Sequence, residues 1–320
     1  MYQNELVPIC MASVLAFSSW LLEDILFYKY LAKKSLGILF IIRLIVIALV
    51  ILLVFLAISI YHYQGKLFIN VREHLELMKW FFFNNAAIYL FTVGILISSF
   101  VNFFKTIRLK VGFEMFHKII SGYYRTPREE NRIFIFIDLI SSTKYAELLG
   151  HRKYSAFLQE CFQRLGILEI KYKAMQYQIV GDEVVLTWPA NKPKNYRYAV
   201  NFYYEYMAEL DKKSRFFKKE FGIIPNFTAS INAGTIMVSE VGTIKSEIAF
   251  HGDVLNTAAR IQKQCKYHKK QLLVTSNFEE KFRAVSAGYK IDWISKDKLV
   301  GKQNPVDIYA IEPNDLQLNE

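Results

Sequence analysis

Two aspartates stand where short apolar stretches of this sequence end. Asp138 follows the run IFIFI, and Asp182 lies in a Gly-Asp turn between predicted strands at 176–180 and 184–188. A carboxylate beside buried strands is costly unless it is paired or binds a metal. Alone, Asp138 could cap the following helix, and Asp182 could be an ordinary turn residue. If their strands are neighbours, the two carboxylates face each other and suit Mg²⁺ bound together with substrate phosphates.

The segment directly after Asp138 reads LISST. Its small residues Ser141, Ser142 and Thr143 join a predicted strand to a predicted helix, where free backbone amides attract anions. Serine and threonine are also the usual N-terminal caps of helices. With a metal-binding aspartate immediately before it, the segment is predicted to hold a polyphosphate.

A third segment, HGDVLNTAARI at 251–261, carries Asn256 and Arg260 four residues apart. On a helix these two side chains share one face. The guanidinium can make a two-pronged contact with phosphoryl oxygens, and the carboxamide can fix a sugar hydroxyl. A helix whose Asn and Arg simply face water is the plain alternative. The small side chains of Ala258 and Ala259 would allow a ligand to approach this helix closely. The function is favoured because all three segments suit the same phosphate-containing ligand.

The elements that must position these residues alternate irregularly between strands and helices. Strands are expected at 133–139, 176–180, 184–188, 227–232, 235–240, 247–250, 272–275, near 289–293 and near 307–311. Helices are expected at 142–165, 196–221, 253–264 and 277–285. Strands and helices that intermix without strict alternation favour an α+β fold with a mixed or antiparallel sheet flanked by helices.

The segments FIDLISSTKYAE, QYQIVGDEVVL and HGDVLNTAARI, in this order and spacing, resemble the catalytic domain of class III nucleotidyl cyclases. The segment SGYYRTPREE before them resembles the lead-in of membrane-anchored bacterial members, and the resemblance covers roughly residues 122–312. It implies attack of the ribose 3′-oxygen of a nucleoside triphosphate on the α-phosphorus, with release of pyrophosphate.

The same resemblance assigns roles to individual residues. Asp138 and Asp182, assisted by the Leu139 carbonyl, would hold two divalent ions, Mg²⁺ or Mn²⁺, in each active site. Asn256 would orient the ribose and Arg260 would stabilise the transition state. The chain would form a homodimer with two equivalent sites, in which the metal-binding and ribose-binding groups come from opposite subunits. Lys302, in the segment LVGKQNP, would contact the triphosphate together with Ser141, Ser142 and Thr143.

The two positions that read the base depart from the family pattern. Adenylyl members usually carry Lys three residues before the hairpin glycine and Asp, Thr or Ser three residues before the later one, whereas this chain carries Gln178 and Ala249. A glutamine amide can pair with the N6 and N7 edge of adenine, and it can also flip to read another base. The expected function is a membrane-bound adenylate cyclase that uses ATP. The alternatives are a cyclase for GTP or a pyrimidine triphosphate, a catalytically inactive nucleotide-binding regulator, and a membrane scaffold.

The N-terminal third is strongly apolar, with charge-free runs at 6–22, 44–61 and 80–104 in a chain that is 53% hydrophobic. A membrane span needs about 20 apolar residues, so these runs predict about three transmembrane helices. The first is marginal, because Pro8 and the pair Glu23-Asp24 shorten it. Buried core helices are the alternative for all three, and a cleaved signal peptide fits the first poorly because no basic region precedes it.

The distribution of basic residues predicts the orientation in the membrane. The net charge is +11, and residues 105–132 hold seven Lys or Arg against three Glu. The positive-inside rule then places the catalytic domain in the cytoplasm, as part of a multi-pass protein of the inner membrane. The charge is expected to face a lipid bilayer rather than nucleic acid. The three cysteines show no metal-binding spacing.

These observations divide the chain into a membrane region at 1–104, a connector helix and linker at 105–130, the catalytic domain at 131–312 and a tail at 313–320. The connector carries an apolar stripe that includes Leu109, Phe113, Phe116 and Ile120. The stripe could pack on a sister helix, lie on lipid, or pack on its own domain.

Overall fold

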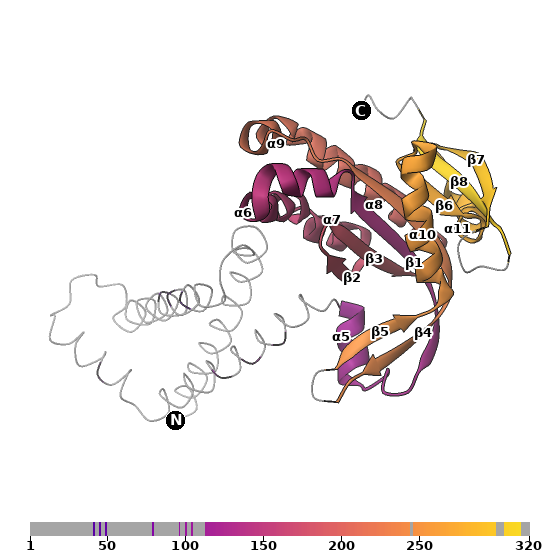
Figure 1. The fold of residues 1–320 in the computed structure, drawn as a ribbon. Coiled ribbons are helices and arrows are strands. Elements are labelled where there is room, and N and C mark those ends of the chain that lie inside the picture. Colours follow the sequence, from indigo (N-terminus) through magenta and orange to yellow (C-terminus); the bar gives the residue numbers. More distant parts are fainter. Residues whose placement is uncertain are drawn as a thin grey trace, which may run out of the picture. The chain divides into compact units, whose positions relative to one another are not determined.

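A computed structural model describes residues 113–243, 246–298 and 304–314, together with the isolated positions 41, 45, 49, 79, 96, 100 and 104 (Figure 1). The chain divides into two compact units, residues 1–116 and 117–320, and the second contains the sheet. Across the described residues, no helix combines the length and the apolar character needed to cross a membrane. The predicted spans at 6–22, 44–61 and 80–104 lie outside the described residues except for isolated positions, so they stay predictions.

The second unit is built on a mixed sheet of eight strands in the order β2-β3-β1-β4-β6-β8-β7, with β5 paired to β4. Neighbouring strands are antiparallel except for the parallel pair β4 and β6. The strands are β1 Arg128–Leu139, β2 Met175–Val180, β3 Glu183–Pro189, β4 Phe227–Val241, β5 Glu247–His251, β6 Leu272–Thr275, β7 Tyr289–Asp297 and β8 Val306–Pro313. The predicted mixed sheet flanked by helices is confirmed.

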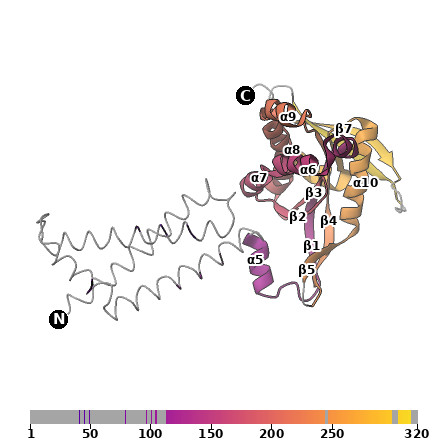
Figure 2. The same ribbon diagram turned by 60° about the vertical axis from the view of Figure 1, so that its left-hand side comes forward.

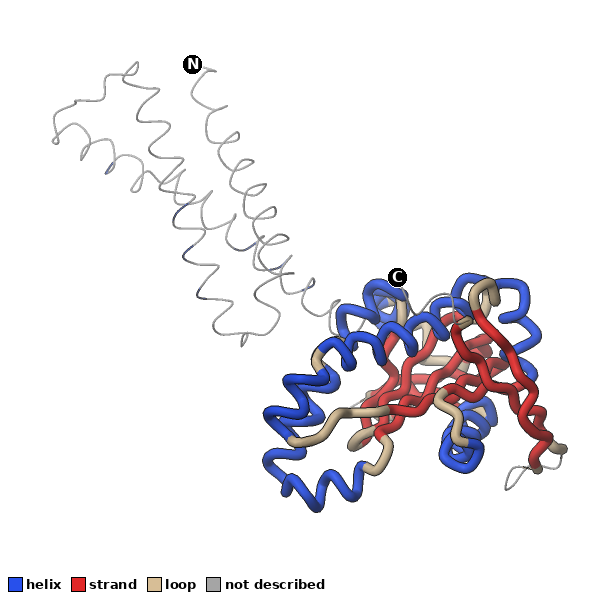
Figure 3. The backbone as a smooth tube through the Cα atoms, turned by 90° about the horizontal axis from the view of Figure 1, so that it is seen from above, coloured by secondary structure: helices blue, strands red, loops and turns tan. Residues whose placement is uncertain are grey.

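Helices cover both faces of this sheet, with several on one face and one on the other (Figures 2 and 3). The first face packs against α6 Ser142–Phe162, α7 Leu165–Tyr172, α8 Pro193–Lys212, α9 Ser214–Phe221 and α11 Ser276–Phe282, which is followed by a 3-10 turn at Arg283–Val285. The second face carries α10 Asp253–His268. Helix α5 Phe113–Ile120 precedes the sheet. Because both faces are covered, the β1 stretch from Ile133 to Ile137 is buried throughout, which explains its uninterrupted apolar run.

Several predicted boundaries are wrong. The helix expected at 196–221 is two helices separated at Lys213, where neither Gly nor Pro marks the break. The strands expected at 227–232 and 235–240 are one strand, β4, because Gly234 continues the ladder opposite Arg132 of β1. Strand β1 begins at Arg128, inside the predicted linker. Helix α6 contains a kink at Gly150, whose φ is 69°.

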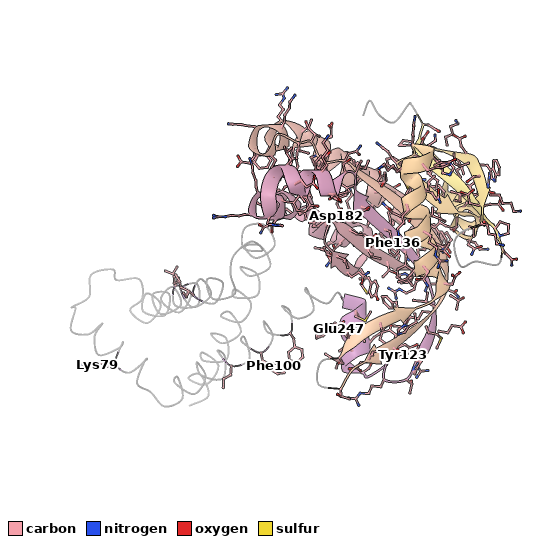
Figure 4. The ribbon with its side chains drawn as sticks, viewed as in Figure 1. Lys79, Phe100, Tyr123, Phe136, Asp182 and Glu247 are labelled. Atoms are coloured by element: carbon pink, nitrogen blue, oxygen red, sulfur yellow. The ribbon has the colours of Figure 1, made fainter. Side chains whose placement is uncertain are left out.

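The far half of β4 and strand β5 form an arm, residues 235–251, that we call the β4–β5 arm. Strand β5 pairs with β4 alone, from Glu247 opposite Val241 to His251 opposite Met237. Figure 4 labels Glu247 and Tyr123 at this arm, at a distance from Asp182 on the central sheet. The Glu240 amide donates to the Tyr124 carbonyl at 2.8 Å, so the segment between α5 and β1 is tied to the arm.

Candidate active site

Asp138 and Asp182 come together at one edge of the sheet. Strands β1 and β3 are antiparallel neighbours, and Asp138 lies opposite Glu183, the residue next to Asp182. Gly181, with φ 63°, makes the two-residue turn that places Asp182 at the tip of the β2–β3 hairpin. The two carboxyl groups are close enough for the charge of Asp182 to raise the pKa of Asp138. Segments more than 40 residues apart in the sequence thus meet through backbone pairing.

Carboxylates of like charge repel one another at this edge of the sheet. Burial first, then the negative charges of Asp182 and Glu183, raise the pKa of the Asp138 carboxyl to about 6. The Leu139 amide donates to the same carboxyl and opposes the rise. The pKa of Glu183 is also raised, by burial and by Asp182, while Lys263 of α10 acts in the opposite sense. A bound cation would relieve this repulsion.

The donor set fits a cation that the substrate helps to hold. No group of three or more His, Cys, Asp or Glu side chains in the described part of the chain is arranged to bind a metal by itself. Magnesium is commonly bound by one or two carboxylates together with substrate phosphates. Two aspartates beside an anion-binding helix start match that pattern. Leu139 can contribute only its carbonyl, because its side chain is buried in the core.

The helix start after Asp138 is open to an anion. Ser141 adopts the left-handed conformation, φ 63° and ψ 31°, and its side chain does not cap α6. That conformation costs a non-glycine residue about 1–2 kcal/mol, and such strain clusters at functional sites. The first turn carries no acidic residue and does carry Lys144. Ser141 and Thr143 are exposed and Ser142 is half-buried, so the first-turn amides have no side-chain cap of their own.

Tyr154 is a neighbour of this loop that the sequence reasoning missed. Burial first, then the charges of Asp182 and Asp138, raise the pKa of its hydroxyl, and Ser142 opposes the rise. Its ring stacks on Phe157 at a centroid distance of 6.3 Å. Tyr154 follows the kink of α6 at Gly150, so regular helical spacing from Ser142 did not point to it.

Helix α10 lies unusually close to β4. A side-chain Cβ at Gly234 would come within 2.9 Å of Val254 Cγ2, and one at Gly252 would come within 3.0 Å of Ile236 Cγ2. Two glycines therefore allow the helix start to approach the strand. This explains why the HGD turn precedes the segment that carries Asn256 and Arg260.

Polar side chains of β4, also missed by the sequence reasoning, fasten α10 to the sheet. Ser230 Oγ donates to the Ala258 carbonyl at 2.7 Å, and Asn232 Nδ2 donates to the Val254 carbonyl at 3.0 Å. Gln262 Nε2 donates to Thr228 Oγ1 at 3.0 Å. Thr228 is the β4 partner of Asp138, so the Gln262 end of α10 lies level with the aspartates. Only their alternation along β4 could have suggested these contacts.

Asn256 and Arg260 are not joined to the aspartates within one chain. Asn256 is exposed and Arg260 is half-buried on α10. Neither side chain makes a hydrogen bond or ion pair with any residue that the structure describes, Asp138 and Asp182 included. Both therefore remain available to a ligand or to a second chain.

The two positions predicted to read the base lie on strands β2 and β5, beside two aromatic residues whose rings are in contact. Gln178 lies on β2 opposite Val185, and Ala249 lies on β5 opposite Ser239. The rings of Tyr177 and Phe250, one residue from each, are 4.8 Å apart. Both positions are half-buried. Lys302, the remaining predicted phosphate contact, lies outside the described residues.

The sequence is similar to that of a curated protein. A protein named adenylate cyclase 2, from Rhizobium meliloti (strain 1021), is 28% identical over 177 residues, which are 55% of this chain and 49% of that protein. This chain thus spans about half the length of that curated relative. No protein-family model matches the chain.

Solved structures share the fold at low sequence identity. The adenylyl cyclase CyaB from P. aeruginosa aligns with a TM-score of 0.52 and 16% identity over 59% of this chain and 97% of its own. The guanylyl cyclase Cya2 aligns with a TM-score of 0.51 and 16% identity over 60% and 96%. The resemblance to nucleotidyl cyclases seen in the sequence motifs is confirmed, and the part of the chain that contains the sheet shares the fold of cyclase catalytic domains.

Proposed function

We propose that this chain is an adenylate cyclase, which converts ATP to 3′,5′-cyclic AMP and pyrophosphate at sites shared between two copies of the chain. The observation that carries the proposal is the meeting of Asp138 and Asp182 beside the uncapped start of α6. A matching relative is named adenylate cyclase.

The chemistry divides among the residues as follows. Asp138 and Asp182, with the Leu139 carbonyl, would hold Mg²⁺ or Mn²⁺, and the bound ions would neutralise negative charge on the reacting phosphates. The amides at Ser141, Ser142 and Thr143 bind the phosphates. The ribose 3′-oxygen forms a bond to the α-phosphorus while the bond from that phosphorus to the pyrophosphate oxygen breaks. The 3′-hydroxyl proton leaves to solvent.

Two residues of α10 complete the site from the other copy. Arg260 donates to the phosphoryl oxygens on which charge develops, and such preorganised donors provide several kcal/mol in related reactions, of order 3 kcal/mol each. Asn256 orients the ribose. The shared site is supported by the absence of any contact between these two side chains and the aspartates among the described residues of one chain.

The choice of nucleotide is tested directly. Purified full-length protein is incubated with ATP, GTP, CTP and UTP and with Mn²⁺ or Mg²⁺, and the products are identified by mass spectrometry. We expect cyclic AMP as the main product, and none when EDTA is in excess. A cyclic product from another triphosphate would support the alternative that Gln178 and Ala249 raise. Absence of any cyclic monophosphate would contradict the enzyme and leave an inactive nucleotide-binding regulator.

The shared site is tested by mixing two inactive variants. In a symmetric dimer, Asp182→Ala and Arg260→Ala chains pair at random, and each mixed dimer keeps one intact site of two. The mixture should recover about a quarter of wild-type activity, since about half of the dimers are mixed. Each variant alone stays inactive. A mixture that stays inactive, while native mass spectrometry shows mixed dimers, would place the whole site within one chain.

We also propose that residues 1–104 anchor the enzyme in the cytoplasmic membrane, with the catalytic domain in the cytoplasm. The three charge-free runs and the basic residues after them support this orientation. Expressed full-length protein should remain in the membrane fraction after a carbonate wash, and recovery in the soluble fraction would contradict the anchor.

A further inference from the structure

Arg132 is a buried charge that the proposed chemistry does not use. It is 1% exposed, on the same face of β1 as Phe134 and Asp138. Its Nε donates to Thr187 Oγ1 at 3.0 Å and its Nη1 donates to Glu130 Oε2 at 2.8 Å. Burying a guanidinium costs desolvation free energy that its partners must offset. The contacts of Arg132 therefore indicate which elements it holds together.

Those contacts join the strands that carry the two base-reading positions. Arg132 reaches Thr187 on β3 and the sulfur of Met175 on β2, at 3.0 and 3.8 Å. Its guanidinium carbon lies 5.2 Å from the centroid of the Phe250 ring on β5. Strand β2 carries Gln178, and β5 carries Ala249. Arg132 thus contacts both strands from β1.

Strands β2 and β5 belong to the same sheet but do not pair with each other. Strand β5 hydrogen-bonds only to β4, and β2 only to β3. The ring of Phe250 bridges them, 4.8 Å from Tyr177 and 5.7 Å from Phe134. Tyr177 itself sits at a register shift of β2 against β3. Backbone ladders connect the two strands only indirectly, through β3, β1 and β4, and side-chain packing makes the direct contact between them.

We propose that Arg132 is a positioning residue for base recognition. It holds the Phe250 ring against Tyr177, through a cation–π contact and its bonds to Glu130 and Thr187, and so sets the spacing of Gln178 and Ala249 around the base. This inference rests on the proposed function only in taking a nucleoside triphosphate as the ligand. Arg132 touches no reacting atom.

The test separates base recognition from phosphate binding and from catalysis. Binding to full-length protein is measured by calorimetry with Mn²⁺ for three probes: 3′-deoxyATP, 3′-deoxyGTP and inorganic triphosphate. The deoxy probes lack the attacking hydroxyl and cannot be cyclised. Inorganic triphosphate reports the metal and phosphate region alone, so it acts as the internal control.

The main variant replaces both residues of the Arg132–Glu130 ion pair. Arg132→Met with Glu130→Gln leaves no unpaired buried charge, which would otherwise unfold the chain. We expect 3′-deoxyATP to bind about tenfold more weakly, roughly the loss of one aromatic and cation–π contact, and the ratio of 3′-deoxyATP to 3′-deoxyGTP affinity to change about fivefold. Inorganic triphosphate should bind within about twofold of wild type, since none of its proposed contacts involves the substituted positions.

Two further variants keep the test decisive if the double variant folds poorly. Phe250→Leu leaves Arg132 with its bonds to Glu130 and Thr187 and should show the same selective loss. Arg132→Lys keeps the charge but not the planar stacking group, so it should fall between wild type and the double variant. Glu129→Gln, an exposed neighbour of Glu130, is the matched control and should bind all three probes normally.

The outcomes are distinct. Equal weakening of all three probes would show a merely structural Arg132 and overturn the inference, as would unchanged binding of all three. Selective loss of the nucleotides supports it, even in a protein that makes no cyclic product, a result that would contradict only the proposed function. A wild-type protein that binds neither nucleotide probe would overturn both.

Discussion

The two ends of the proposed ligand site are held by different kinds of force. At the aspartate end, Asp138 lies between two backbone ladders, opposite Glu183 of β3 and Thr228 of β4. At the base end, β5 is paired with β4 on one side, and its direct contact with β2 is made by the Phe250 and Tyr177 rings. Backbone pairing tolerates many side chains, whereas ring packing depends on each one.

This difference accounts for where the sequence keeps the cyclase pattern and where it departs from it. The segments of Asp138 and Asp182 match the pattern, and backbone pairing positions them. The α10 segment also matches, on a helix that side-chain hydrogen bonds attach to β4. The departures, Gln178 and Ala249, occur on β2 and β5, which contact each other through side chains. For the proposed enzyme, this layout predicts that substitutions at the base end change base preference without disturbing the phosphoryl chemistry at the aspartate end.

The largest effect is expected at the aspartate end. Asp138→Asn should lower cyclase activity at least about 1,000-fold, the scale of removing one preorganised electrostatic group. The same change should stabilise the metal-free protein, because it removes the repulsion that raises the pKa of this carboxyl. The measurement pairs activity with thermal unfolding in EDTA, and Asp211→Asn on the exposed end of α8 is the matched control.

The sign of that stability change follows from proton binding. The folded-state pKa of Asp138, about 6, lies above its ordinary value of 3.8, so the folded state binds the proton more tightly than the unfolded state. Stability therefore falls as pH rises from about 4 to about 6, and the ionised group costs about 1 kcal/mol above that range after solvent screening is allowed for. A less stable Asp138→Asn protein at pH 7 would contradict the repulsive pair.

A smaller effect is expected where α10 rests on β4. Gly234→Ala places a Cβ 2.9 Å from Val254 Cγ2, and should lower unfolding free energy by about 1–3 kcal/mol. Displacing Arg260 with the helix should lower activity about 10- to 100-fold. Adding Val254→Ala removes the clashing methyl group and should restore part of the activity. Gly166→Ala on α7, where a Cβ meets nothing within 4 Å, is the control and should leave both quantities near wild type.

The sequence predicted the aspartate end of the site better than the contact between α10 and β4. The meeting of Asp138 and Asp182 followed from two apolar strands that end in carboxylates, because strand ends and a Gly-Asp turn have strong local signals. The buried Ser230, Asn232 and Gln262 carried no such signal, since their role depends on which helix crosses β4. The single strand β4 was divided in the prediction because Gly234 normally interrupts a strand, whereas here it admits Val254.

At the base end, the sequence pattern did not predict the burial of Arg132 or its contact with Phe250. Arg132 stands at the start of an apolar run and reads as a strand-flanking, solvent-facing charge, yet it is fully buried. Nothing local in the sequence brings Arg132 to Phe250, since the two are more than 100 residues apart and not paired by backbone. Long-range ring and guanidinium contacts of this kind depend on the final packing, not on periodicity.

The smallest effect is expected at the outer end of the base-side network. Glu130, which holds Arg132, also accepts hydrogen bonds from Lys118 Nζ of α5 at 2.9 Å and from the Tyr124 hydroxyl at 2.7 Å. Tyr124 is 1% exposed. Lys118→Met removes one of three partners, and a partly exposed ion pair contributes about 0–1 kcal/mol.

We therefore expect Lys118→Met to change the ratio of ATP to GTP turnover about twofold, in the direction of the Arg132 variant and with turnover at saturating ATP unchanged. The control is Lys171→Met, which breaks an exposed ion pair between Lys171 on α7 and Glu205 on α8. This variant should leave the ratio of ATP to GTP turnover unchanged. The effect is small because Tyr124 and Arg132 still orient Glu130. An effect at Lys118 as large as at Arg132 would mean that α5 controls the base end directly, and the aspartate and base ends would then differ in regulation as well as in the forces that hold them.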